Sequence, residues 1–206
     1  MEQQKKRKVI KIVVALLATL SLISFGYYWF YMRNVIFSDK ASVSAPIVDI
    51  GTEKAGTLKE IFVKEGDLIK PYAHIARIDN FNVSSKASGL VIKTNNQIGK
   101  LFSPGMPIVT IINPQDMRVL AHIEENNGLS EIRVGQKVKF TVDAFDSKEY
   151  FGTVDEIAKS SDESSVAFSI SDKREVKQFI VKIKYDVATY PELLNGMSAR
   201  VWIYKE

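Results

Sequence analysis

The sequence predicts an all-β ectodomain carried on one N-terminal transmembrane helix, and three observations support this fold class. Residues 12–32 contain no charged side chain. A segment that begins at Gly56 is repeated, without a gap, 33 residues further along the chain. Beyond position 33, short runs rich in Val, Ile, Phe and Thr recur between Gly, Pro and Asn or Asp, which is typical of strands separated by turns.

The uncharged segment from Ile12 to Met32 is long enough to cross a membrane. At about 1.5 Å per residue, a helix of this length spans a hydrocarbon core of roughly 30 Å. Most neighbouring basic residues precede the segment, so the N-terminus is expected in the cytoplasm and the rest of the chain outside. A cleaved signal peptide is the alternative, but bulky aromatic residues stand where its small-x-small cleavage site would be. The residues expected at the membrane interfaces are Lys5, Lys6, Arg7, Lys8, Lys11, Tyr28, Trp29, Tyr31 and Arg33.

The charge distribution does not indicate a nucleic-acid-binding protein, although the sequence pI is about 9.1. Six of the 28 basic residues and one of the 24 acidic residues, Glu2, flank the predicted anchor. The remaining 22 basic and 23 acidic residues give the ectodomain a net charge near −1, and its lysines are dispersed among acids. The chain has no cysteine, which excludes a disulfide framework and a lipid-modified cysteine.

The repeat predicts one supersecondary unit that is built twice and packed against itself. Each copy has a glycine before a strand, a second glycine at a sharp turn, then a proline and two isoleucines in register. Neither copy can bury its apolar face alone, so the two halves are expected to form one domain over residues 51–113. The turn residues of these half-motifs are expected to be Gly56, Gly66, Asp67, Gly89 and Gly99.

A second all-β module is predicted for residues 114–206, after a break in the strand pattern at Asn113 to Asp116. The runs 137–142 and 179–185 alternate apolar with polar residues, as strands with one wet face do. Only Glu124 to Ile132 has the pattern of a short helical turn. Residues 1–11 are then a cytoplasmic basic tail, 12–32 the transmembrane helix, and 33–50 a linker with a leading strand.

Motifs in both modules are similar to those of a known family. The first half runs from Gly56-x-Leu58 through Glu65-Gly66-Asp67 to Ile75-Ala76-x-Ile78-Asp79, and the second from Ser88-Gly89-x-Val91 to Val109-x-Ile111. Together they resemble the halves of a biotinyl/lipoyl-type domain, specifically that of membrane fusion proteins, the periplasmic adaptors of the HlyD type. The resemblance covers nearly the whole chain and implies a barrel-sandwich hybrid (lipoyl-like) domain followed by a small β-barrel. The residues that resemble the barrel motif include Gly135, Gly152, Gly196 and Met197.

The join between the two halves departs from the family pattern. Adaptors of this family usually carry a long α-helical hairpin there, and its tip docks with an outer-membrane exit duct. In this chain the join is expected to be a short loop, so the resemblance implies a short form of the adaptor, unlikely by its geometry to reach an outer-membrane duct. The inter-half loop is predicted to consist of Asn80, Phe81, Asn82, Val83, Ser84 and Ser85.

No group of residues indicates catalysis, a metal site or a cofactor. Lys86 lies between the halves, where a carrier lysine would be lipoylated or biotinylated, but it lacks the Asp-Lys-Ala or Met-Lys-Met context of a carrier. The only histidines, His74 and His122, have no further ligand at metal-binding spacing and are interpreted as structural or solvated. Three acidic groups are interpreted as dispersed surface charges: Glu124-Glu125, Asp143 with Asp146, and Asp162-Glu163.

The sequence therefore predicts a non-enzymatic, single-pass subunit of an export or efflux transporter in the cell membrane, without a cofactor. Its expected partner is an ABC-type permease with its ATPase, and assembly of several copies is an option. Contacts are expected from the membrane span, from the barrel surface at 143–151 and from the inter-half loop. The alternatives are an envelope interaction protein without a transport role and, less favoured, a membrane-anchored carrier domain modified on Lys86.

Overall fold

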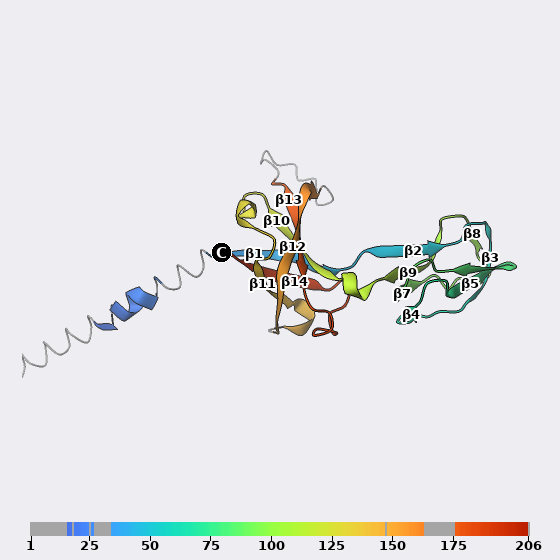
Figure 1. Cartoon of the computed structure of the whole chain (residues 1–206), viewed down its shortest axis with the longest axis horizontal. Helices are drawn as coiled ribbons and strands as arrows, with labels where there is room; N and C mark the ends of the chain where they lie inside the picture. The colour runs from blue at the N-terminus through green and yellow to red at the C-terminus, as the bar shows by residue number, and fades with distance from the viewer. Residues whose placement is uncertain are drawn as a thin grey trace, which may run out of the picture.

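The predicted β architecture is confirmed in the described residues beyond position 33, which form two modules, a closed barrel and a two-sheet sandwich (Figure 1). The computed structural model describes residues 16–17, 19–24, 26, 34–146, 148–162 and 176–205. Antiparallel strands form the barrel, in the order β1 (Val35–Ser44), β10 (Arg118–Glu124), β13 (Gln178–Lys184), β12 (Glu149–Asp162), β11 (Lys137–Val142) and β14 (Ser198–Tyr204).

The sandwich has two four-stranded sheets that the internal repeat relates to each other. One sheet has the order β2 (Ile47–Gly51), β9 (Pro107–Ile112), β7 (Gly89–Thr94) and β4 (Leu68–Ile69). The other has the order β6 (Phe81–Ser84), β5 (His74–Ile78), β3 (Gly56–Ile61) and β8 (Leu101–Phe102). Strands β2, β3, β4 and β5 of the first repeat correspond to β6, β7, β8 and β9 of the second, 33 residues later. Exchanging each strand for its equivalent turns the order of the first sheet into that of the second. The sandwich is therefore pseudo-twofold symmetric.

The sandwich core is made of equivalent residues from both repeats, as the sequence predicts. Leu58 and its equivalent Val91 are 0% and 1% exposed, and the isoleucines of β5 and β9 are equally buried. Because each repeat places its strands in both sheets, neither half has a core without the other. The interlocked halves explain why the apolar positions recur in register.

The leading strand belongs to the barrel. The sequence predicts a linker with a leading strand for residues 33–50, whereas β1 pairs with β10 on one side and with β14 on the other. Only Ala45 and Pro46 separate β1 from β2, the first strand of the sandwich. The chain thus enters the barrel first, makes the whole sandwich, and returns to complete the barrel.

In the described part of the chain beyond residue 33, helical structure is limited to short 3-10 turns: η1 (Pro114–Asp116), η2 (Leu129–Glu131) and η3 (Asp143–Phe145). The helical turn predicted for 124–132 is confined to η2, because Glu124 still pairs with β13. The predicted membrane span lies only partly within the described residues, and these contain no helix long and apolar enough to cross a membrane. The predicted interface residues Lys5, Lys6, Arg7, Lys8, Lys11, Tyr28, Trp29, Tyr31 and Arg33 lie outside the described residues.

Candidate functional site

The second glycine of each repeat lies in a turn that is hydrogen-bonded to the other repeat. Gly66 and Gly99 have φ values of 94° and 86°, a backbone region that favours glycine. The Gly66 N–H donates to the Val91 carbonyl and the Gly99 N–H to the Leu58 carbonyl, both at 2.8 Å. The Asp67 carboxylate accepts from the Lys64 N–H at 2.8 Å and closes its own turn. These turns therefore hold the two halves together.

The first glycine of each repeat lies in a strand, which corrects its assignment to a turn. Gly56 begins β3 and Gly89 begins β7, and neither has a positive φ. A Cβ on Gly89 would lie 2.7 Å from the Ile112 carbonyl oxygen, and one on Gly56 would lie 2.5 Å from Ile78 Cγ2. Glycine is required here by close approach between neighbouring strands.

The inter-half loop predicted for Asn80 to Ser85 is mostly a strand. Phe81–Ser84 form β6, which pairs antiparallel with β5 and places Val83 in the core. The join between the two repeats is the two-residue turn of Asp79 and Asn80, without a helical hairpin. The Asp79 N–H donates to the Thr57 carbonyl at 2.9 Å, so this turn is fastened to β3.

Lys86 lies inside the second repeat, after β6, and not at the join between the halves. Its equivalent in the first repeat is Glu53, and the two side chains form an ion pair at 2.8 Å. The hydrogen bond between them, with their mutual attraction, lowers the pKa of Glu53 and raises that of Lys86. Since these are equivalent residues, their contact lies on the pseudo-twofold axis.

The other chemically suggestive residues have ordinary structural partners. His74 Nδ1 lies 2.9 Å from Ser84 Oγ, and the backbone carbonyl of His122 accepts a hydrogen bond from Ser38. Glu124 pairs with Lys40, and Asp143 pairs with Arg200. Among the described residues, no group of three His, Cys, Asp or Glu side chains could hold a metal ion. Glu163 lies outside the described residues.

Each glycine of the barrel motif lies where two segments of backbone come close together. The Gly135 N–H donates to the Val154 carbonyl at 2.8 Å, and the Gly196 N–H to the Val43 carbonyl at 2.8 Å. The Met197 carbonyl accepts from the Val43 N–H at 2.8 Å. A Cβ on Gly152 would lie 2.6 Å from the Lys184 carbonyl oxygen. Gly196 and Met197 therefore form backbone hydrogen bonds to the end of β1, just before the chain enters the sandwich.

Each connection between the barrel and the sandwich has one buried residue that packs into the barrel's apolar cluster. Ala45 in the first connection and Met117 in the second are 5% and 4% exposed, and both belong to the barrel's apolar cluster. Ile112, the last residue of β9, belongs to the same cluster. The Ala45 N–H also donates to Asn195 Oδ1 at 2.9 Å. Packing and hydrogen bonds thus hold both connections.

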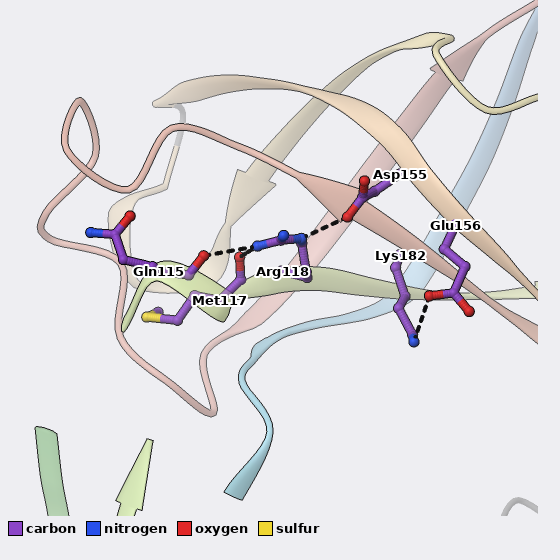
Figure 2. Close-up of polar contacts among 6 residues, drawn as sticks. All are labelled: Gln115, Met117, Arg118, Asp155, Glu156 and Lys182. Carbon is purple, nitrogen blue, oxygen red and sulfur yellow. Dashed lines mark hydrogen bonds and ion pairs between the residues drawn. The ribbon is translucent and has the colours of Figure 1, made fainter. Parts of the chain in front are cut away.

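Arg118 links the second connection to β12 of the barrel (Figure 2). Its Nη1 donates to the Gln115 and Met117 carbonyls at 3.1 and 2.9 Å, and its Nε donates to Asp155 at 2.9 Å. Asp155 lies in β12, two strands away from Arg118 in β10. The guanidinium therefore joins the connection to β12 across β13.

An aromatic row crosses the outer face of the barrel. Phe37 in β1 is opposite Trp202 in β14, Trp202 is opposite Lys139 in β11, and Lys139 is opposite Phe151 in β12. The Phe37 and Trp202 rings are 5.2 Å apart, and Lys139 Nζ lies 5.2 Å from the Trp202 ring centroid. Phe37 and Phe151 are 44% and 57% exposed. Of this row, only Phe151 belongs to the contact surface that the sequence predicts at 143–151.

The barrel interior holds a cluster of aromatic rings that includes the buried tyrosines Tyr150 and Tyr185. Tyr150 stacks on Phe140 at 5.3 Å, and Tyr185 lies 5.8 Å from the same ring. Within the described residues, the Tyr185 hydroxyl has no hydrogen-bond partner. Burial raises the pKa of Tyr185 to about 12.

Comparison with known proteins gives the same arrangement of modules. Residues 39–112 match the family described as the YknX barrel-sandwich hybrid domain. The chain is 27% identical over 127 residues to the "Putative efflux system component YhbJ" of Bacillus subtilis (strain 168). That match covers 60% of this chain and 57% of the relative, so the chain spans little more than half of the relative's length.

Two solved structures share the fold over 84% of this chain and 99% of their own. They are ZneB from Cupriavidus metallidurans, with a TM-score of 0.66 at 13% identity, and the membrane fusion protein Spr0693 from Streptococcus pneumoniae R6, with a TM-score of 0.57 at 15% identity.

Proposed function

We propose that this chain, whose sandwich matches a barrel-sandwich hybrid domain model, is a member of the periplasmic adaptor, or membrane fusion protein, family and serves as the membrane-anchored adaptor of an efflux transporter. Members of this family are not enzymes, and the proposal assigns no catalytic step to the chain. The adaptor's work is mechanical: it holds a folded ectodomain at the transporter's exit and guides or couples the release of substrate.

The observation that carries the proposal is the position of β1. Two residues separate this strand from the end of the predicted anchor, and it pairs with β10 and β14, so the anchor would lead into the barrel wall. Within the predicted anchor, Leu16, Leu17 and Leu20 are helical and 61–63% exposed, as lipid-facing side chains would be. The anchor therefore places the barrel next to the membrane and the sandwich beyond it.

The aromatic row is the surface that suits the transporter. Phe37 is three residues from Asn34, about 10 Å along the strand, so the row starts close to the anchor. Exposed aromatic residues are typical of the side chains that dominate protein interfaces. We assign the row, with the predicted surface at 143–151, as the barrel's contact with the permease, for which an ABC-type partner is proposed.

The two-residue join at Asp79 and Asn80 limits how far the adaptor reaches. A helical hairpin at this point would extend the sandwich toward a second membrane, and the turn offers no such arm. We therefore place the adaptor's work at one membrane, with its N-terminus in the cytoplasm, its two modules outside, and no outer-membrane duct.

Purification of the full chain from native membranes in mild detergent after light crosslinking tests this function. A polytopic transporter subunit, identified by mass spectrometry, is the expected partner. Recovery of the chain alone would count against it, and capture of a wall-synthesis protein would favour the envelope role. Intact mass of the same sample tests the carrier alternative: a lipoyl or biotinyl mass on Lys86 would support that role, whereas the position of Lys86 within the second repeat predicts an unmodified chain.

A further inference from the structure

A cleft of about 580 Å³ opens between β2 and β6, away from the barrel contacts described above. Its apolar lining includes Val48 and Ile50 from β2 and Phe81 and Val83 from β6. Ile50 and Val83 are buried, whereas Val48, two residues before Ile50 and so on the same face, is 44% exposed. The cleft is therefore an opening into the apolar space between the two sheets.

The cleft lies on the pseudo-twofold axis of the sandwich. Its walls are formed by residues from 48 to 54 and by their equivalents from 81 to 87, and the Glu53–Lys86 ion pair joins the two walls. Val48 corresponds to Phe81, and Ile50 corresponds to Val83. Each repeat thus contributes the same apolar positions to one cleft.

Tyr72 also lines the cleft, and it differs from its equivalent in the second repeat, which is a glycine. It follows Pro71 in a turn closed by the Ala73 N–H and the Lys70 carbonyl, and it has a φ of 66°. The equivalent turn of the second repeat has Gly105 at this position, with a φ of 83°. Such a turn favours glycine, so a tyrosine there is strained. Because its side chain is 80% exposed, packing in the fold does not account for it.

The chemistry of the cleft defines the ligand that it suits. Its volume falls within the range of small-molecule sites, about 300–1,000 Å³. The charged residues that line it, Asp49, Glu53, Lys54 and Lys86, sum to zero net charge. β2 and β6 are the terminal strands of their sheets, so the outer edges of both present backbone polar groups at the rim. Apolar walls, a polar rim and balanced charge together suit a compact amphipathic molecule without net charge.

We propose that the cleft between β2 and β6 binds an uncharged or zwitterionic amphipathic small molecule, over which the Tyr72 ring closes. The strained turn is then retained because an aromatic ring at this position contacts the ligand, as backbone strain often accompanies function. The site stands whether or not the transporter partner is the one proposed above.

Protection of an introduced cysteine tests the site, because the chain has no cysteine of its own. Val48→Cys places a thiol in the cleft, and Val134→Cys places the same change at an exposed barrel position, where Val134 is 66% exposed. The full chain in lipid nanodiscs is labelled with a water-soluble maleimide, with and without the neutral amphipathic probe N-phenyl-1-naphthylamine. The probe is expected to slow labelling of Val48→Cys severalfold and to leave Val134→Cys unchanged.

Adding Tyr72→Gly to Val48→Cys is expected to raise the half-protecting probe concentration by about tenfold through loss of the aromatic contact. The Tm should not fall, because glycine relieves the turn. Unchanged labelling of Val48→Cys at saturating probe, or equal slowing at both cysteines, would overturn the site. Protection that appears only with a co-purified membrane protein would assign the cleft to a protein partner and also overturn it. Equal protection with and without Tyr72 would refute the role of its ring.

Discussion

Replacing Arg118 with alanine is expected to loosen the link between the barrel and the sandwich. The side chain is 20% exposed, and it donates to the Gln115 and Met117 carbonyls and to Asp155. Each carbonyl bond contributes about 1 kcal/mol. The ion pair adds about 0.5 kcal/mol, because the Asp155 side chain is 41% exposed and screened by water. Arg118→Ala should therefore cost about 2–3 kcal/mol.

A neighbouring ion pair provides a matched control (Figure 2). Lys182 and Glu156 form a 2.9 Å pair between β13 and β12, with side chains 41% and 61% exposed. The pair touches neither connection between the modules, so Lys182→Ala should cost at most about 0.5 kcal/mol. Arg118→Ala removes hydrogen bonds to the connection at Gln115 and Met117, whereas Lys182→Ala removes only an ion pair between two barrel strands.

Thermal unfolding of the full chain, followed by far-ultraviolet circular dichroism, measures the difference. A loss of 2–3 kcal/mol should lower the Tm of Arg118→Ala by about 5–10 °C, and Lys182→Ala by about 2 °C or less. Hydrogen exchange should also speed up at Met117 in Arg118→Ala. Equal Tm values for the two variants, with unchanged exchange at Met117, would refute the assignment of Arg118 as the fastening of the two modules.

Two further changes test the close packing and the unpaired hydroxyl. Gly89→Ala should destabilise the chain by about 2 kcal/mol, because its Cβ would meet the backbone carbonyl of Ile112, which cannot turn aside. An unchanged Tm for this variant would contradict the close approach of β7 and β9. Tyr185→Phe should cost little near pH 7, because no described residue bonds the lost hydroxyl. The raised pKa of Tyr185, about 12 against an ordinary 10, stabilises the folded state below pH 10, and this contribution is lost as the pH rises toward 12. The urea midpoints of wild type and Tyr185→Phe should therefore shift relative to each other between pH 10 and 12, and parallel curves would rule out a buried, protonated tyrosine.

The repeat could be predicted because its buried positions tolerate few residues. Leu58, Ile75 and Ile78 share one buried cluster with their equivalents from the second repeat, so the apolar pattern recurs at a fixed spacing. The repeat also extends upstream to β2 and β6, which the sequence did not reveal. These are edge strands with one neighbour each, and many residue types satisfy that environment.

β6 was missed because of its polar residues. Asn80, Asn82 and Ser84 suggest a loop, but Phe81 and Val83 alternate with them at the spacing of a strand with one buried face. The period-2 signal was present over only four residues, which is too short to outweigh the turn-forming composition.

The candidate contacts depended on pairing between distant segments. Arg118 and Asp155 are 37 positions apart, and the aromatic row draws Phe37 and Trp202 from opposite ends of the ectodomain. Only strand register brings such residues together, and register follows from the whole barrel. The sequence indicates which side chains face outward on each strand, but not which strands lie next to each other.

Photo-crosslinking from Phe151 in native membranes tests the central claim most directly. A benzophenone amino acid at this position is expected to form a covalent product with an integral membrane transporter subunit, since the row faces the proposed permease. The same amino acid at Leu101, a sandwich residue that is 63% exposed, is the matched control and should not give that product. Products from Phe151 that contain only wall-synthesis or soluble proteins would contradict the assignment of this chain as a transporter's adaptor.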